Sequence, residues 1–241
     1  MKLNLIYLLF PAITFVSAQN DNVIYQDSQK GFVIYQEKAT LNGVEIYNSE
    51  KEEIEFINKE QHDSEQCRVL ADIYRNPLSL IDNYYSYEYY FGSESACGNY
   101  GDVVTVETID LTTLKKISLT ELFTESSILL ALKNDSWVLK QLNSSSTKIE
   151  VDSIKSFSQM IELLNSFDSF LEFKPYSFAI TDSKPKKGKI AVRIVGKQYI
   201  GFNHHQHLQL GLWLEPKTLS RKKFLSKIKF VTGDYKNGLT Q

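Results

Sequence analysis

The sequence predicts an α+β fold in which a mostly antiparallel β-sheet packs with two or three helices. Most strand-like segments lie before residue 120 or after residue 177, and the apolar residues between them recur at helical spacing. An order of strands followed by helices and then by further strands is typical of α+β proteins. It differs from the regular alternation of strands and helices that builds a parallel sheet. The 241 residues are 42% hydrophobic, which is ample for a core.

The first elements expected are a β-hairpin and a short acidic helix. Residues 31–35 and 44–47 have strand sequence, and Leu41-Asn42-Gly43 between them is a turn signal. The hydroxyl of Ser49 can cap a helix that ends before Asp63.

The next part of the chain is expected to form a sheet. Proline removes a donor from a strand ladder, so Asn76-Pro77 is expected to separate two strands. Residues 84–91 are too aromatic for an ordinary loop, and aromatic rings pack well on a pleated surface. Residues 110–116 form a turn that makes the strands on either side antiparallel neighbours. The expected strands are 68–74, 78–81, 84–91, 103–109 and 117–119.

Two helices are expected in the middle of the chain. The first begins at Thr124 or Ser126 and runs through a weak point at Asn134-Asp135-Ser136. Asp152 is the expected cap of the second helix. The two apolar stripes are Ile128, Leu129, Leu132, Leu139 and Leu142, and Ile154, Phe157, Ile161, Leu164 and Phe167. The remaining expected elements are strands at 178–180, 189–195 and 208–214 and a closing basic helix over 217–230.

Residues 1–18 have the pattern of an export signal. Lys2 supplies a positive start, Leu3 to Val16 is almost entirely apolar, and Val16-Ser17-Ala18 places small residues before a cleavage point. The apolar run is shorter than the roughly 20 residues of a spanning helix, and no membrane span is expected elsewhere. We therefore expect a cleaved signal peptide, one domain over residues 19–241 and an extracytoplasmic location, either periplasmic or secreted.

The chain contains two cysteines, Cys67 and Cys97. In an oxidising compartment an even number favours one disulfide. Closing a loop of about 30 residues would stabilise the fold by roughly 3–4 kcal/mol in the chain-entropy model. Two free buried thiols are the alternative, and neither the spacing nor the neighbouring residues indicate a metal-thiolate site.

The net charge of −2 is divided unevenly along the chain. From Ser183 to Gln241 there are 13 lysines and arginines against Glu215 and Asp234, so this part carries +11 and the remainder −13. The basic end could meet an acidic glycan, and the acidic run from Glu50 to Glu65 could meet a cationic protein. Two solvated faces are the simpler alternative. Nucleic acid is not expected as a partner, because the exported chain has no motif that reads it.

Several short motifs follow one another in the central part of the chain. They are Leu78-Ser79-Leu80, Tyr89-Tyr90, Ser95 to Tyr100, Ile109-Asp110-Leu111 with Thr113, and Ile117-Ser118-Leu119 through Glu121-Leu122-Phe123. In this order they resemble the exported PdaC/RsiV-like family, domain of unknown function 3298. The resemblance is strongest over residues 78–123 and extends roughly from Phe32 to Pro216.

The resemblance implies an α+β domain that accompanies peptidoglycan deacetylases or acts as the lysozyme-binding sensor of an anti-sigma factor. The deacetylase chemistry lies in a separate domain for which this chain has no room, and we expect neither a transmembrane segment nor a cytoplasmic anti-sigma region. At the turn, Cys97 and Gly98 stand where the family often has His and Pro, and Leu114-Lys115 replaces the glycine of its hairpin. The resemblance therefore implies a stand-alone domain that binds peptidoglycan or a lysozyme-like protein, and no role of the family's histidine is carried over.

His204-His205-Gln206-His207 contains three of the four histidines. On a strand, His205 and His207 point to the same face, and neutral imidazoles ligate zinc, copper or nickel. Two ligands are fewer than the three or four of a zinc site, and no HExxH motif accompanies them. Surface or structural histidines are therefore favoured, and a metal-assisted hydrolase is the alternative function.

Other patterns that could carry chemistry are weak. Residues 92–96 do not match the GxSxG nucleophile turn, and Cys97 as a nucleophile would need stabilisation of its thiolate. No glycine-rich phosphate-binding motif exists, so no cofactor is expected. A glycosidase-like carboxylate pair would have to come from residues whose separation the sequence does not give. These are Glu88, Glu94, Asp102 and Asp110.

The tyrosines near residue 87 support binding better than catalysis. Alternation puts Tyr85, Tyr87 and Tyr89 on one face, and amphipathic rings suit a sugar or a protein surface. Core packing is the alternative for whichever face points inward. The sequence thus predicts an exported, noncatalytic binding domain whose ligand is an envelope glycan or a lysozyme-like lytic enzyme.

Overall fold

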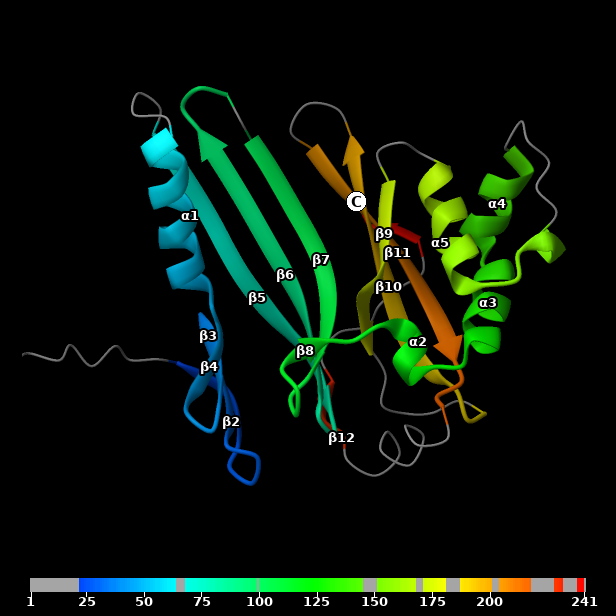
Figure 1. Cartoon of the computed structure of the whole chain (residues 1–241), viewed down its shortest axis with the longest axis horizontal. Helices are drawn as coiled ribbons and strands as arrows, with labels where there is room; N and C mark the ends of the chain where they lie inside the picture. The colour runs from blue at the N-terminus through cyan, green and yellow to red at the C-terminus, as the bar shows by residue number, and fades with distance from the viewer. Residues whose placement is uncertain are drawn as a thin grey trace, which may run out of the picture.

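The computed structural model of the chain describes residues 22–63, 68–98, 100–144, 151–167, 171–180, 187–200, 204–217, 228–231 and 238–240. Within these ranges the strands form three sheets, and each strand pairs antiparallel with its neighbours (Figure 1). The predicted α+β class with mostly antiparallel sheet is confirmed. The expected signal peptide, residues 1–18, lies outside the described residues.

The N-terminal sheet is a four-stranded meander in the order β1-β2-β3-β4. Its strands are β1 (Val23–Asp27), β2 (Phe32–Tyr35), β3 (Lys38–Leu41) and β4 (Val44–Asn48). The predicted turn is present, and Asn42 and Gly43 both have positive φ, 52° and 78°. It joins β3 to β4, so the expected pairing of 31–35 with 44–47 is wrong. Strand β3 could not be predicted from the sequence, because the Gln36-Glu37 connection before it contains none of the residues typical of turns.

Helix α1 (Ser49–Asp63) is the short acidic helix expected from the sequence. Its cap differs from the prediction, because Asn48 Oδ1 accepts from the backbone N–H of Lys51 at 3.1 Å. The hydroxyl of Ser49 is buried and accepts instead from Arg75 Nη1 at 3.2 Å. The residue predicted as a cap therefore connects the helix to the next sheet.

The central sheet has the order β12-β5-β6-β7-β8. Its strands are β5 (Val69–Ile81), β6 (Tyr84–Ser95), β7 (Tyr100–Asp110), β8 (Lys115–Lys116) and β12 (Ile228–Val231). The chain turns back after β7 as expected, but the strand that pairs with β7 is β8, which lies within the predicted 110–116 turn. The expected strand over 117–119 is wrong, because Ser118 is the N-cap of α2 (Leu119–Leu122) in a capping box with Glu121.

Strand β5 continues through Pro77, where the sequence predicts a break. The backbone N–H of Ala96 donates to the carbonyl of Arg68 at 2.9 Å, in line with the register that places Val69 opposite Ser95. Hydrogen-bonded pairs alternate along an antiparallel ladder, so from Arg68 to Pro77, before the register shift between Pro77 and Ser79, even-numbered residues bond to β6 and odd-numbered ones point their backbone groups outward. Pro77 is odd-numbered, and its missing N–H therefore removes no bond to β6.

The C-terminal sheet has the order β13-β11-β10-β9. Its strands are β9 (Leu171–Ile180), β10 (Ile190–Ile200), β11 (His204–Leu214) and β13 (Gly238–Thr240). The three long strands extend the three predicted ones. A small buried cluster joins this sheet to the central one through Leu78, Val106, Ala179 and Val195.

Three further helices are α3 (Glu125–Lys133), α4 (Ser136–Ser144) and α5 (Phe157–Ser166). The predicted first helix is two helices, because Asp135 Oδ1 accepts from the N–H groups of Trp137 and Val138 and starts α4. The predicted cap of the second helix is also wrong. Asp152 lies in a 3-10 turn, and Ser156 caps α5 by accepting from the N–H of Gln159 at 3.2 Å.

The core has two main parts, one between the central sheet and the N-terminal sheet and one around the C-terminal sheet and its helices. Helices α3, α4 and α5 cover the C-terminal sheet on the side away from the central sheet (Figure 1), and the core there includes Phe178, Leu210 and their neighbours. On the other side, Phe32 and Ile34 of the N-terminal sheet pack against Leu80 and Tyr85 of the central sheet. Helix α1 runs alongside β5.

The end of the chain differs from the prediction where it is described. Residues 228–231 form β12, so the closing helix expected over 217–230 is wrong at its end, and residues 218–227 lie outside the described part. Within the described ranges, the structure contains no helix that combines the length and apolar character needed to cross a membrane.

Candidate functional site

The predicted tyrosine row lies on the face of β6 that points toward the N-terminal sheet. Tyr85 and Tyr87 are buried, with 0% and 5% of their surface exposed, and Tyr89 is half-buried. The hydroxyl of Tyr85 lies 3.1 Å from that of Tyr47, and Tyr87 donates to Glu107 Oε2 at 2.6 Å. Of the three predicted binding residues, Tyr89 keeps surface that a ligand could contact.

Arg75 occupies the space beside these rings. Its guanidinium carbon lies 4.6 Å from the ring centre of Tyr47 and 4.7 Å from that of Tyr89. Its Nη2 donates to Glu52 Oε2 at 2.8 Å, and its side chain is 10% exposed. Burial opposes the charge of Arg75, but the hydrogen bond and charge of Glu52 raise its pKa. The cation–π contacts and the ion pair hold α1, the N-terminal sheet and β5 together.

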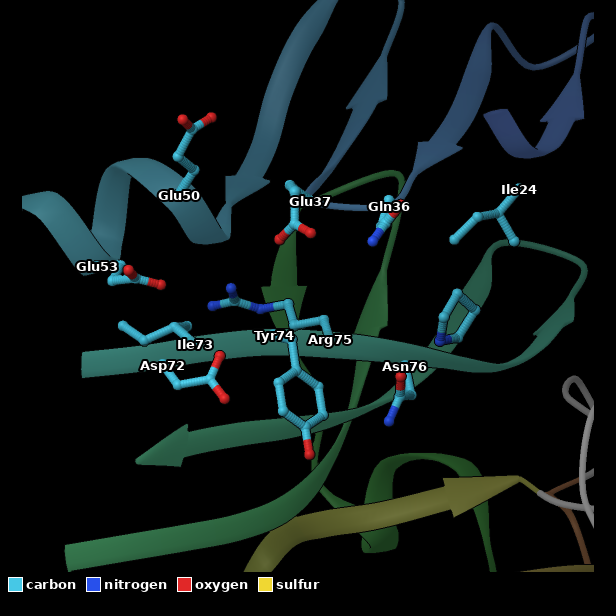
Figure 2. A pocket seen from close by; sticks show the side chains of 11 residues that line it. Ile24, Gln36, Glu37, Glu50, Glu53, Asp72, Ile73, Tyr74, Arg75 and Asn76 are labelled. Atoms are coloured by element: carbon cyan, nitrogen blue, oxygen red, sulfur yellow. The ribbon is translucent and has the colours of Figure 1, made fainter. Parts of the chain in front are cut away.

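A groove of about 670 Å³ borders Arg75 (Figure 2). We call it the edge groove. Its lining is Ile24, Gln36, Glu37, Glu50, Glu53 and the six consecutive residues Asp72 to Pro77 of β5. Successive side chains of a strand point to opposite faces, so a groove that borders six residues in a row must run along the edge of the strand.

The edge groove is acidic. Glu50 and Glu53 come from α1, Glu37 from the connection between β2 and β3, and Asp72 from β5 (Figure 2). Burial first, and then the charges of Glu50, Glu53 and Asp72, raise the pKa of Glu37. The basic residue of the lining, Arg75, already holds Glu52. The groove therefore presents a negative field to solvent.

Sequence reasoning identifies only part of this groove. The acidic run that predicts a cationic partner includes Glu50 and Glu53. Glu37 and Asp72 stand apart from that run, and no sequence signal places them beside it. Alternation along a strand places Arg75 on the same face as Ile73, which is a weak sign that Arg75 faces the core. The sequence does not indicate which aromatic rings surround it.

The predicted metal ligands belong to β11, as the prediction assumes. His205 pairs with Tyr199 and His207 with Lys197 in the β10–β11 ladder. The side chains of residues 204–207 lie outside the described part, so metal binding by His205 and His207 stays a prediction. Among the side chains that are described, no group of three or more His, Cys, Asp or Glu residues could hold a metal ion.

Two of the carboxylates considered for a glycosidase pair have structural partners. Glu88 Oε2 accepts from Arg193 Nη2 at 2.9 Å, and Asp110 Oδ1 accepts from the N–H of Thr112 at 2.8 Å. Glu94 lies exposed near the end of β6, and the side chain of Asp102 lies outside the described part.

The predicted disulfide involves one residue that the structure describes. Cys97 lies in an exposed turn, where its N–H donates to Ser95 Oγ at 3.2 Å. Cys67 lies outside the described residues, so the pair stays a prediction. The residues next to the two cysteines in the chain, Arg68 and Ala96, are joined by the backbone hydrogen bond at the start of the β5–β6 ladder.

No protein-family model matches the chain, and no curated protein matches it. The resemblance to the PdaC/RsiV-like family thus stays a hypothesis that rests on the motifs between residues 78 and 123.

Proposed function

We propose that this chain is a noncatalytic binding domain that holds a positively charged protein at the edge groove. The observation that carries this proposal is the meeting of four carboxylates from three separate elements around one groove, Glu37, Glu50, Glu53 and Asp72. Their mutual repulsion contributes to the raised pKa of Glu37. A cationic ligand would relieve that repulsion, which is a favourable contribution to binding.

The negative charge of the groove favours one of the two ligand classes expected from the sequence over the other. A polyanionic envelope glycan would be repelled at this surface, whereas a basic lysozyme-like protein would be attracted. The lysozyme-like enzyme is favoured among cationic proteins because of the family resemblance. Export, which residues 1–18 predict, would bring the domain to the same compartment, and N-terminal sequencing of the secreted protein should then begin at Gln19.

The test is calorimetric binding of the purified protein to lysozyme at low and high salt. We expect binding that weakens with salt and that falls by about tenfold, or 1.4 kcal/mol, in the double variant Glu50→Gln, Glu53→Gln. The matched control is Glu55→Gln, Glu162→Gln, which removes the same charge from two exposed residues outside the lining. Equal losses in both variants, no binding to lysozyme, or stronger retention by insoluble peptidoglycan would contradict the proposal.

A further inference from the structure

The outer edge of β5 is paired over only part of its length. In the described residues, β12 pairs with β5 at Ser79 to Ile81, and no strand pairs with the outer edge at Ala71, Ile73 and Arg75. Gln61 Oε1 accepts from the N–H of Val69 at 3.2 Å and so closes one end of this stretch. Pro77, which has no N–H, closes the other end.

The backbone groups that remain between these two ends belong to alternate residues. The alternation set by the Ala96–Arg68 hydrogen bond directs the N–H and C=O groups of Ala71, Ile73 and Arg75 away from β6. The edge groove runs along this part of the strand, since its lining includes every residue from Asp72 to Pro77. An unpaired strand edge with outward donors and acceptors is a template for another extended segment.

We propose that a basic, extended segment of a partner protein binds in the edge groove as an added strand, antiparallel to β5 and paired with Ala71, Ile73 and Arg75. This inference rests on the proposed function and specifies how the cationic partner is held. The antiparallel direction follows from continuity, because β12 pairs in that direction further along the same edge.

The charge pattern specifies which residues of the added strand are basic. Residues directly opposite each other in an antiparallel pair have side chains on the same face of the sheet. The face of Ile73 and Arg75 is the one on which Glu37, Glu50 and Glu53 lie, above the strand in Figure 2. The other face carries Asp72, Tyr74 and Asn76. The segment therefore has lysine or arginine at alternate positions, and these same residues make the backbone hydrogen bonds to β5.

The test uses a synthetic peptide, acetyl-Thr-Lys-Thr-Lys-Thr-Lys-Thr-amide, and two N-methylated forms of equal charge. Methylation of the three lysine nitrogens removes the donors that would face β5, whereas methylation of the three following threonine nitrogens removes donors that would face solvent. We expect the first form to bind at least about tenfold more weakly than the parent peptide and the second to bind within about threefold of it. Amide exchange by NMR should show that Ala71, Ile73 and Arg75 exchange rapidly in the free protein and slow down with the parent peptide bound.

The outcomes separate the binding mode from the proposed function. If both methylated peptides bind as well as the parent while Glu50→Gln, Glu53→Gln weakens all three, strand addition is overturned and charge-driven binding stands. Slow exchange of the three amides in the free protein would also overturn the inference, since the edge would then be covered already. If the parent peptide does not bind but lysozyme binds through the edge groove, strand addition is overturned and the proposed function stands.

Discussion

The hydroxyl oxygens of Ser86 and Thr108 lie 2.8 Å apart in a fully buried pair across β6 and β7. This pair provides hydrogen-bond partners for backbone groups on the outer edge of β9. The N–H of Ile180 donates to Ser86 Oγ at 3.3 Å, and Thr108 Oγ1 donates to the carbonyl of Phe178 at 2.8 Å. Each hydroxyl has one proton, so Ser86 must donate to Thr108, and the bonds run in one direction from Ile180 to Phe178. Two side chains on the face of one sheet thus take the place of a neighbouring strand for the edge of another.

Thr108→Val should test this arrangement, because valine keeps the shape and removes the hydroxyl. The buried carbonyl of Phe178 and the hydroxyl of Ser86 would each lose a partner, and we expect a loss of about 1–3 kcal/mol in the free energy of unfolding. Thr113→Val, at an exposed position in the turn before β8, is the control and should change stability by less than about 0.5 kcal/mol. Urea denaturation of both variants measures the difference, and similar stabilities would contradict the assigned role of the pair.

Arg75→Lys should destabilise the protein although the charge is kept. Lysine cannot place one flat group against Tyr47 and Tyr89 while it bonds to Glu52. We expect a loss of about 1–2 kcal/mol in the free energy of unfolding. The matched control is Arg68→Lys at an exposed position, which should be nearly neutral. If the two variants are equally stable, Arg75 does not hold α1 to the sheets in the way described.

Gly196→Ala should destabilise the protein, because the added methyl group would collide with the ring of Phe173. A Cβ atom at this position would lie 2.7 Å from Cζ of Phe173, which is 2% exposed. Overpacking of this kind costs about 1–3 kcal/mol. Gly101→Ala is the control, because a Cβ atom there meets nothing within 4 Å. Thermal melts should show a lower Tm for Gly196→Ala alone, and an unchanged Tm would mean that Phe173 moves aside.

Glu37→Gln should stabilise the protein at neutral pH. The pKa of Glu37 is raised above its usual 4.5 by burial and by Glu50, Glu53 and Asp72. With a raised pKa in the folded state, ionisation of Glu37 costs stability, and this cost grows as the pH rises from the unfolded-state pKa toward the folded-state pKa. We expect a gain below about 1 kcal/mol at pH 7, because the side chain is largely exposed. The gain should disappear as the pH falls below about 4.

Glu45→Gln is the control of opposite sign. Hydrogen bonds from Lys51 and Asn48 lower the pKa of Glu45, so its contribution to stability is present above the unfolded-state pKa and is lost as the pH falls through the folded-state pKa. Glu45→Gln should therefore lower the free energy of unfolding at pH 7. Denaturation of both variants between pH 3 and pH 7 is the measurement, and shifts of the same sign would contradict the charge arrangement of the groove.

The predicted disulfide should be visible in the purified protein. The hydrogen bond between Arg68 and Ala96 places the neighbours of Cys67 and Cys97 at the same end of the β5–β6 ladder. We expect mass spectrometry of a non-reduced digest to show the two cysteine peptides joined, and reduction to lower the free energy of unfolding by roughly 3–4 kcal/mol. Alkylation of both thiols in the unfolded, non-reduced protein would show that they do not pair.

Predictions from the sequence are best where a few neighbouring residues carry the signal. The positive φ values at Asn42 and Gly43, the helix after Asn48 and the alternation of tyrosines along β6 all follow from local backbone preferences. Local rules fail where a distant element changes their outcome. Pro77 does not break β5, because its backbone faces away from β6 and its missing N–H therefore removes no bond to that strand.

By itself, the sequence determined the α+β class, the strand positions at 84–91 and 103–109 and the acidic character of α1. Only the tertiary structure decided that Tyr85 and Tyr87 are buried, and that Glu37 and Asp72 join Glu50 and Glu53 around the outer edge of β5. The physical reason is range: backbone preferences act over a few residues, whereas burial and the sum of charges in a groove depend on which elements pack together.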